Sequence, residues 1–326
     1  MNRPVQNATN EAINGPVLIT INAAHEGQRI DNYLVTTLKG VPRSLIYRLL
    51  RKGQVRVNKG RIKPVYRLKS GDIVRIPPLA RPAPADAQRP PAELCRRLQD
   101  AILYEDADLI ALNKPPGIAV HGGSGIRFGV IETLRFLRDD CPDLALVHRL
   151  DRNTSGCLLL SKRRPILLQL HELLRDGFIN KHYDALVAGQ WQGGTSRVDK
   201  ALQKNRQLSG ERMVQVDDEG QAASSLFSPQ RVYHGCTLVD VRIDTGRMHQ
   251  IRVHAAHLGH PVAGDDKYGD DAFNRTMRTF GLKRMFLHAR VIEFTLPDSG
   301  RHIRIEAPLD VSLQNVLNRL EQQESG

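Results

Sequence analysis

Apolar residues recur at helical spacing in two segments near the start of the chain. In residues 27–40, Ile30, Leu34 and Leu38 are four apart, which places them on one face of a predicted helix. Residues 42–53 open with a proline and end with a glycine, and basic side chains cover the positions outside their apolar face. The pattern therefore predicts two short amphipathic helices in succession.

Short strands are predicted on both sides of these helices. Residues 17–22 and 71–77 are apolar-rich and short, which is typical of strands. Residues 54–63 read as a hairpin with its turn at Lys59–Gly60. Two helices and a basic hairpin between two strands predict a compact module of the kind that reads RNA.

The rest of the chain mixes strands with helices. Strands are predicted at 108–117, 157–160, 182–191 and 236–244. A helix is predicted over 164–177, with Pro165 near its start and Gly177 at its end. A second helix follows a turn at Thr245–Gly246 and ends at Gly259. Because no regular βαβ repeat appears, we expect an α+β fold with a mixed sheet.

The length of 326 residues suits two domains. The stretch PPLARPAPADAQRPP contains six prolines and is typical of a semi-rigid linker. We therefore expect five parts: a disordered tail (1–16), a small α/β domain (17–80), a Pro-rich linker (81–97), a larger mixed-sheet domain (98–315) and a polar tail (316–326).

The positive charge is concentrated in the first module. The whole chain carries a net charge of +12, and residues 29–78 alone carry +11, from 13 Lys and Arg against two acidic residues. Such a dense basic surface indicates binding to a polyanion through its phosphates. The candidate contacts lie on the second helix and the hairpin: Arg43, Arg48, Arg51, Lys52 and Arg56.

This module resembles the S4 RNA-binding domain. The resemblance is carried by RIDNYL, SLIYRLLRKGQVRVN and LKSGDIVRI within residues 29–78. It implies docking of structured RNA through the second helix and the hairpin. It implies no particular chemistry, because a fold alone does not determine an activity.

Several common kinds of site find no support in the sequence. The glycine-rich loops that hold nucleotides and the GxSxG motif of hydrolases are absent. The best metal candidate is His254, His257 and His260, but His260 lies beyond Gly259 and no acidic ligand has matching spacing. We therefore expect neither a metal nor a cofactor.

The sequence also favours an intracellular, water-soluble protein. No apolar run approaches the length of a membrane span, and the start of the chain has no secretory signal pattern. The four cysteines are scattered without CxxC spacing, which is typical of a reducing compartment. We therefore expect a cytoplasmic location and no contact with membranes.

One carboxylate attracts attention as a catalytic candidate. Asp151 stands between Arg149 and Arg152, shortly before the apolar strand at 157–160. Taken alone, this pattern favours a structural ion pair or a turn cap. Other segments shift the balance by placing polar residues at strand ends and turns: Lys114, Tyr183, Arg247, His249 and Arg252. Together they indicate a nucleophilic or electrostatic site that acts on an anionic polymer.

The segments that hold these residues closely resemble the RluA-type pseudouridine synthases. The hallmark is HRLDRNTSG at residues 148–156. The supporting segments are LNKPPGIAVHGGSG, KHYDALVAGQW, DTGRMHQIRVHAAHLGHPVAGDDKYG and RMFLHA. The resemblance spans residues 17–312, and it is strongest to members that modify large-subunit ribosomal RNA.

The resemblance implies a role for each matching residue. Asp151 aligns with the essential aspartate, which attacks C1′ of the ribose or C6 of the base, or assists a glycal intermediate. Arg252 aligns with the arginine that pairs with it. Tyr183 aligns with the tyrosine that stacks on the target base and is a candidate for moving the C5 proton. Ile251 would pack against the nucleoside, and Arg149 would fill the gap left by the flipped uridine.

Competing roles stay open for five residues. The alternative for Tyr183 is an ordinary aromatic residue of its strand. Arg247 either binds a phosphate or fixes its turn. Lys114 is counted among the RNA contacts, although support of its strand end fits it better than chemistry does. His148 and His249 fit hydrogen-bonded structural histidines better than proton shuttles.

The resemblance implies isomerisation of uridines in large-subunit ribosomal RNA without a cofactor. We expect a monomer without an evident protein partner, because no extra apolar stripe requires one. Three alternatives are weighed. Transfer RNA could be the substrate instead. An S4-bearing RNA methyltransferase would need a glycine-rich loop for its methyl donor, and HGGSG at 121–125 is the nearest segment. A non-enzymatic assembly factor would not need Asp151, Tyr183 and Arg252.

Overall fold

The computed structural model describes residues 15–38, 41, 43–79, 89–123, 125–206 and 212–325. The chain divides into two compact units, Met1–Arg89 and Pro90–Gly326, each of which is described by itself. Most of the expected N-terminal tail, and residues 81–88 of the expected linker, lie outside the described residues.

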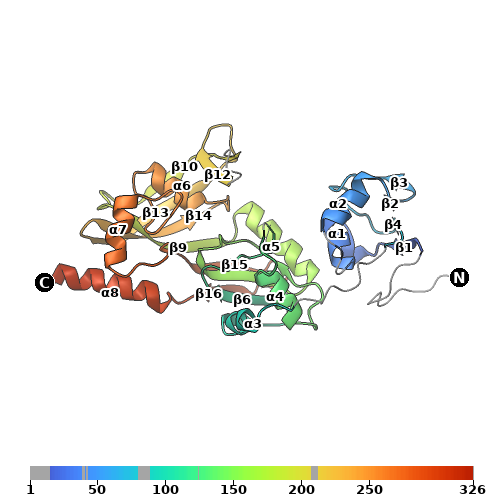
Figure 1. Ribbon diagram of the computed structural model, residues 1–326, viewed down its shortest axis with the longest axis horizontal. Coiled ribbons are helices and arrows are strands. Elements are labelled where there is room, and N and C mark those ends of the chain that lie inside the picture. The colour runs from blue at the N-terminus through green and yellow to red at the C-terminus, as the bar shows by residue number, and fades with distance from the viewer. Residues whose placement is uncertain are drawn as a thin grey trace. The chain divides into compact units, whose positions relative to one another are not determined.

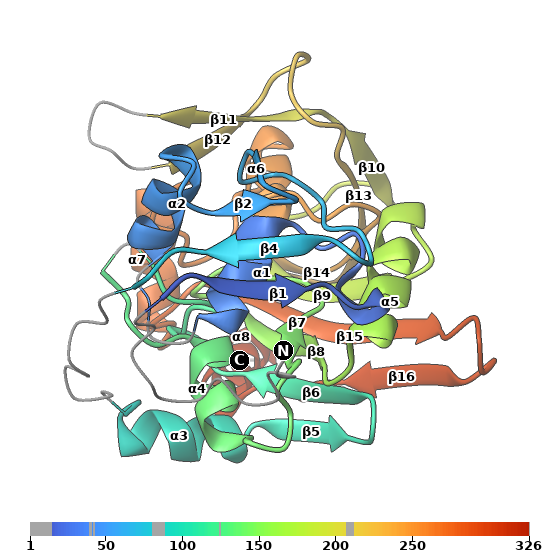
Figure 2. The same cartoon turned by 90° about the vertical axis from the view of Figure 1, so that its right-hand side faces the viewer.

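The N-terminal unit packs two helices on one small antiparallel sheet (Figures 1 and 2). In chain order its elements are β1 (Val17–Thr20), the 3-10 helix η1 (Ala23–His25), α1 (Ile30–Thr37), α2 (Arg43–Arg51), β2 (Arg56–Val57), β3 (Gly60–Arg61) and β4 (Ile73–Ile76). The strand order is β1-β4-β2-β3. Ile30, Leu34 and Leu38 are all buried in its core, so the predicted helix face is confirmed.

The hairpin turn lies one residue earlier than its predicted position at Lys59–Gly60. Val57 pairs with Gly60, so Asn58 and Lys59 form the turn, and both have positive φ. Asn tolerates this conformation better than most residues. The Asn58 amide also donates to Asp72 Oδ1 at 2.8 Å, and its Oδ1 accepts from the backbone of Ile73 at 2.9 Å. These side-chain bonds hold Asn58 in the turn.

The second unit is built on one ten-stranded mixed sheet. Its strands are β5 (Ile102–Glu105), β6 (Leu109–Lys114), β7 (Ala145–Leu146), β8 (Ser155–Ser161), β9 (Asn180–Ala188), β10 (Ser196–Asp199), β13 (Ser224–Tyr233), β14 (Cys236–Ile243), β15 (Leu287–Thr295) and β16 (His302–Glu306). The main order is β10-β13-β14-β9-β15-β8-β6-β5, with β7 on β8 and β16 on β15. The β8–β15 pair is parallel and the others are antiparallel, which confirms the mixed sheet.

Helices and one separate hairpin surround this sheet. The helices are α3 (Ala92–Gln99), α4 (Val130–Leu137), α5 (Arg164–Asp176), α6 (Gln250–His257), α7 (Asp271–Thr279) and α8 (Val311–Ser325). Strands β11 (Leu202–Arg206) and β12 (Arg212–Val216) form a hairpin that packs beside α6. In Figure 1, α3 and α4 lie near β6, whereas α6 and α7 lie near β13 and β14.

Two segments differ from the expected domain limits. Residues 92–97, expected in the linker, form most of α3, where Leu98 joins the core of the sheet domain. Residues 316–325, expected in a polar tail, belong to α8, where Val316, Leu317 and Leu320 are buried against the sheet domain. The segment looks like a polar tail when only its overall composition is considered. The spacing of its apolar residues is what places one face of α8 in the core.

The predicted buried strand after Asp151 is an interior strand of the sheet. All seven residues of β8 are buried between β6 and β15. Gly156 has a φ of 106°, and a Cβ on it would lie 2.2 Å from the backbone oxygen of Ala289. Only glycine therefore permits β8 to approach β15 this closely directly after the Asp151 loop.

Candidate active site

Asp151 lies on the loop that connects β7 to β8. The Leu150 side chain is buried in the core and anchors the loop, whereas Asp151 remains 27% exposed. The Thr154 backbone N–H donates to the Asp151 carbonyl oxygen at 3.2 Å and closes a turn after the carboxylate. The loop therefore presents the carboxylate to a cavity while its neighbours hold the backbone.

Lys114 supports the end of β6, which is one of the two roles predicted for it, and not the other, a contact with an RNA phosphate. Its side chain is fully buried at the end of β6. The ammonium donates to the carbonyl oxygens of Pro115, Ile118 and Arg152 at 2.9, 3.0 and 3.1 Å. Three acceptors match the three donors of an ammonium group. Lys114 therefore joins the β6 end to the residue after Asp151, and this role leaves no donor for a phosphate.

Arg252 brings positive charge to Asp151 from the first turns of α6. Its Nη1 lies 3.4 Å from Asp151 Oδ2. Its Nε and Nη2 each lie 2.6 Å from an oxygen of Asp265, in a two-pronged pair. The Asp265 carboxylate is fully buried and the Arg252 side chain is only 9% exposed. Asp265 thus fixes the guanidinium in place beside the Asp151 carboxylate.

His249 is the second cation-capable group beside Asp151. Its Nε2 lies 3.9 Å from Asp151 Oδ2, and its Nδ1 lies 2.9 Å from the Tyr268 hydroxyl. Because the Val214 backbone N–H already donates to that hydroxyl, the Tyr268 proton is available to His249 Nδ1. Burial lowers the pKa of His249 against the opposing effect of Asp151. A neutral His249 therefore carries its proton on Nε2, facing Asp151.

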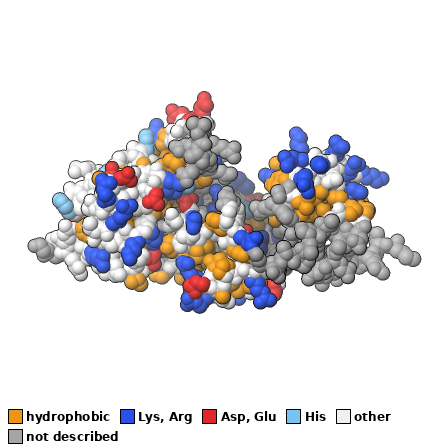
Figure 3. Space-filling view, viewed as in Figure 1, with side chains coloured by type: hydrophobic (Ala, Val, Ile, Leu, Met, Phe, Trp, Pro, Cys, Tyr) orange, Lys and Arg blue, Asp and Glu red, His pale blue; other side chains and the backbone are white. Residues whose placement is uncertain are grey.

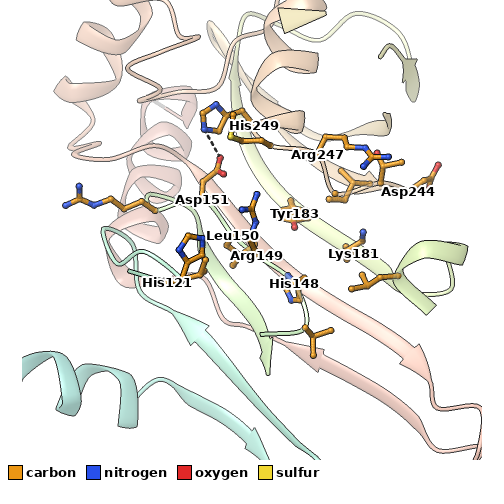
Figure 4. Close-up of a pocket in the computed structure, with 18 of the residues that line it drawn as sticks. His121, His148, Arg149, Leu150, Asp151, Lys181, Tyr183, Asp244, Arg247 and His249 are labelled. Carbon is orange, nitrogen blue, oxygen red and sulfur yellow. Dashed lines mark ion pairs between the residues drawn. The ribbon is translucent and has the colours of Figure 1, made fainter. Parts of the chain in front are cut away.

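The backbone at His249 departs from ordinary geometry. His249 precedes α6 with a φ of 55°, in the left-handed region that non-glycine residues seldom adopt. Such a conformation persists only where its surroundings hold it, and it is typical of functional sites. Here it is held by the contact with Tyr268, and it directs the ring toward Asp151 (Figure 4).

Tyr183 forms part of the wall of the same cavity. The cavity has a volume of about 650 Å³, and Asp151, Tyr183 and His249 are among the residues that line it. Burial, followed by the charge of Asp151, raises the pKa of the Tyr183 phenol, so it is protonated at neutral pH. Ile251 is buried and lines an adjoining recess with Asp151 and Tyr183. The structure thus brings together Asp151, Tyr183, Ile251 and Arg252, as the resemblance implies.

Two exposed arginines stand at the rim of this cavity. Arg149 is exposed and makes no hydrogen bond or ion pair within the described residues, so its guanidinium can reach a ligand. Arg247 is also exposed, and its Nε donates to the Ala222 carbonyl oxygen at 3.0 Å. That contact supports the turn. The other N–H groups of the Arg247 guanidinium are left at the rim of the cavity, where a ligand can accept from them.

The half-buried His148 and the buried His254 have structural partners. His148 Nε2 accepts a hydrogen bond from the Leu159 backbone N–H at 3.1 Å. Burial, more than the charge of Lys181, lowers the pKa of His148 to about 4. The His254 ring nitrogens lie 3.0 Å from Ser225 Oγ and 3.0 Å from the Lys200 carbonyl oxygen. Both ring nitrogens of His254 are therefore engaged in hydrogen bonds within the chain. Neither is available to bind a metal with His257 and His260.

The sequence interpretation missed three residues of the site. Asp265 and Tyr268 lie within DDKYG, where nothing in the spacing links them to Arg252 and His249. Lys181 is the third, and it lines the cavity two residues before Tyr183 on β9. The alternation of β9 was the available signal, because residues two apart on a strand share a face.

In the N-terminal unit the predicted RNA contacts form an exposed basic surface. Arg48, Arg51, Lys52 and Arg56 are all exposed on α2 and the adjoining hairpin. The Arg43 side chain lies outside the described residues. In Figure 3, Lys and Arg side chains gather on the visible face of this unit. Because these side chains are exposed, the surface can contact several phosphates of an RNA backbone at once.

Comparison with known sequences identifies both units. A sequence model of the family "RNA pseudouridylate synthase" matches residues 108–257, and one of the S4 domain matches residues 28–74. The chain is 52% identical over 312 residues to ribosomal large subunit pseudouridine synthase C of Pasteurella multocida (strain Pm70), which covers 94% of this chain and 95% of that protein. For the protein of the same name from Escherichia coli (strain K12), identity is 52% over 306 residues, covering 93% of this chain and 96% of that one.

Comparison with solved structures agrees on the fold. Human RNA pseudouridylate synthase domain containing 4 matches with a TM-score of 0.59 at 24% identity, and the match covers 70% of this chain and 96% of that chain. Human RNA pseudouridylate synthase domain containing 1 matches with a TM-score of 0.52 at 23% identity. This match covers 68% of this chain and 94% of that chain. At this level of identity the likeness shows a shared fold.

Proposed function

This chain belongs to the RNA pseudouridylate synthase family, and from that premise we propose that it converts particular uridines of large-subunit ribosomal RNA to pseudouridine. The observation that carries the proposal is the Asp151 carboxylate, which faces the cavity beside Arg252. The choice of RNA rests on the relatives that are 52% identical over nearly the whole chain and are named for the large ribosomal subunit.

The reaction rearranges one bond of the nucleotide. The N1–C1′ bond breaks, the base turns, and a C5–C1′ bond forms while C5 loses a proton and N1 gains one. No electrons are gained or lost overall, so the reaction needs no redox partner. Asp151 in its ionised form is the nucleophile, directed at C1′ or C6 or assisting a glycal path. Arg252 supports this role because its positive charge lies 3.4 Å away.

Other side chains of the cavity hold the flipped nucleotide. Tyr183 stacks on the base, and its protonated phenol is placed to exchange a proton with the base. Ile251 supplies an apolar contact to the nucleoside. Arg149, exposed at the rim, enters the space that the uridine leaves in the RNA. Arg247 binds a backbone phosphate with the donors that its turn leaves available.

The basic N-terminal unit anchors the RNA. Phosphate contacts from Arg48, Arg51, Lys52 and Arg56 position the substrate, whereas the cavity selects the base. The domain limits expected from the sequence then need two changes, with α3 and α8 added to the catalytic domain. We expect the protein to work as a single chain in the cytoplasm. No helix among the described residues could span a membrane, and its four cysteines are unpaired.

The methyltransferase alternative finds no support at the HGGSG segment. The Glu132 carboxylate accepts from the backbone N–H groups of Gly122 and Gly129 at 2.9 and 3.0 Å. These two N–H groups are therefore occupied by the chain itself and are not available to the carboxylate of a methyl donor.

A pseudouridine map of ribosomal RNA tests the proposal. Large-subunit RNA from a strain without this gene is compared with RNA from strains that carry wild type or Asp151→Asn. We expect particular pseudouridines to disappear and to return only with wild type. Asp151→Asn should retain RNA binding, because the phosphate contacts lie elsewhere. Unchanged ribosomal sites would overturn the choice of RNA and direct the same map to transfer RNA, and activity of the variant would overturn the choice of nucleophile.

A further inference from the structure

Lys181 is a buried cation in the cavity to which the reaction above gives no role. It lies on β9 two residues before Tyr183, so both side chains point to the same face of the sheet. Its side chain is only 6% exposed, and it lines the same cavity as Asp151 and Tyr183. Figure 4 shows the three in the order Asp151, Tyr183, Lys181 across the cavity.

The chain itself leaves this ammonium uncompensated. Within the described residues, Lys181 Nζ makes no hydrogen bond and no ion pair. The carboxylate that attracts it, Asp244, is already bound by Arg197 at 2.8 Å and by the Ser224 hydroxyl at 3.1 Å. His148, on the neighbouring loop, is neutral at neutral pH and uses its Nε2 for a backbone contact. The ammonium lines the cavity, so a ligand bound there can complete its hydrogen bonds.

The position of Lys181 favours the base over the RNA backbone as that ligand. Arg149 and Arg247 are exposed at the rim, where backbone phosphates can reach them without leaving water. Lys181 lies at the buried wall, beyond Tyr183 as seen from Asp151. A uracil that stacks on Tyr183 with its ribose near Asp151 would direct its far carbonyl edge toward Lys181. At this depth in the cavity, Lys181 would contact the flipped base and not a backbone phosphate.

Resting on the proposed function, we propose that the Lys181 ammonium donates a hydrogen bond to a carbonyl oxygen of the target uracil and stabilises the base when it detaches. When the N1–C1′ bond breaks, its electron pair stays with the base and spreads from N1 onto O2 and O4. A fixed cation in a water-poor cavity stabilises such charge strongly. Lys181 keeps its proton throughout and forms no covalent bond.

The symmetry of uracil makes one lysine sufficient for the whole reaction. A half-turn about the N3–C6 axis exchanges N1 with C5 and exchanges O2 with O4. The same ammonium therefore meets a carbonyl oxygen before and after the turn. Cytosine carries an amino group at C4, so in one of the two orientations it would present a donor to a donor. Lys181 thus contributes to the selection of uracil.

Lys181→Met separates this role from a structural one. The change keeps the length of the side chain and removes its charge, while Lys200→Met removes an exposed lysine as the matched control. The substrate is large-subunit ribosomal RNA from the deletion strain, labelled with tritium at C5 of uridine. We expect the saturating single-turnover rate of tritium release to fall about 100-fold or more for Lys181→Met, as for loss of one donor to a developing charge. The RNA Kd and the melting temperature should match those of wild type and Lys200→Met.

Each other result has a distinct meaning. A weaker Kd with an unchanged saturating rate would show that Lys181 holds a phosphate, and it would overturn the proposal. A rate and a Kd that both match the control would show a packing role, with the same consequence. If Lys181→Met fails to fold, Lys181→Gln is judged by the same criteria. Failure of wild type to release tritium would instead overturn the proposed function.

Discussion

The buried pair of Arg252 and Asp265 offers a quantitative test of how the site is held together. Both oxygens of Asp265 bind the guanidinium at 2.6 Å, and Oδ1 also accepts the backbone N–H groups of Lys267 and Tyr268 at 2.9 and 3.2 Å. Burial raises the pKa of Asp265, but the contacts with Arg252 outweigh burial and leave that pKa below its ordinary value. The change to test is Asp265→Asn, which preserves shape and removes the charge.

The expected loss follows from these contacts. An asparagine oxygen can still accept the two backbone N–H groups, but its amide group then presents donors to the guanidinium. Arg252 is left buried without its main partner, and breaking a buried ion pair in this way costs about 3–5 kcal/mol in the free energy of unfolding. Asp266→Asn, at the exposed neighbouring position, is the matched control and should change stability by less than about 0.5 kcal/mol.

The chain carries its own reporter for this measurement. Trp191 is the single tryptophan, and it is buried in the core of the sheet domain. Urea unfolding followed by Trp191 fluorescence therefore reports on the domain that contains Asp265. An Asp265→Asn midpoint equal to that of Asp266→Asn would refute the view that this pair holds the site. Isomerisation should also slow beyond the loss of folded protein, because the guanidinium no longer has a fixed position beside Asp151.

Three further changes test other parts of the site. Gly156→Ala should prevent correct folding of the sheet domain, because its Cβ would lie 2.2 Å from Ala289 O, and circular dichroism of the purified variant checks this. For His148, whose pKa is lowered from 6.5 to about 4, the unfolded chain binds more protons between these values. The free energy of unfolding should therefore fall as pH drops from 6.5 to 4, by about 3 kcal/mol from this group. An NMR titration of ring-labelled histidine should show the His148 ring neutral at pH 5.5, and a charged ring there would contradict its assigned environment. Tyr183→Phe should retain RNA affinity and slow isomerisation by about 100-fold or more if the phenol moves a proton, whereas an unchanged rate would leave only stacking.

Local patterns predicted much of the architecture. The apolar spacing of Ile30, Leu34 and Leu38 specified one helix face, and the apolar run at 157–160 predicted the central strand. These predictions succeed because each depends on neighbours in the chain. The hairpin turn was placed one residue late because Asn58 is held by Asp72, a contact that no local pattern contains.

Exposure and long-range pairing were harder to predict. For Lys114 the sequence left open support of the strand end or an RNA contact. The folded chain selects the first, because three carbonyl oxygens supplied by two loops complete its hydrogen bonds. Nothing in the local sequence distinguishes the buried Asp265 from the exposed Asp266 beside it. Which of two adjacent aspartates turns inward depends on where Arg252 lies, and only the folded chain specifies that.

The charges around Asp151 illustrate the same difference between sequence and space. Arg149 and Arg152 flank it in the chain, yet neither makes an ion pair with it within the described residues. Arg152 Nε donates instead to the Gly117 carbonyl oxygen at 2.9 Å, and Arg149 stays at the rim. The cation that contacts Asp151 is Arg252, which is 101 residues away in sequence and is itself held by a buried carboxylate. A flanking arginine on a loop would move with the RNA that it touches, whereas Arg252 belongs to a helix. Under the proposed mechanism, a pairing charge on α6 would stay beside Asp151 while Arg149 moves with the RNA.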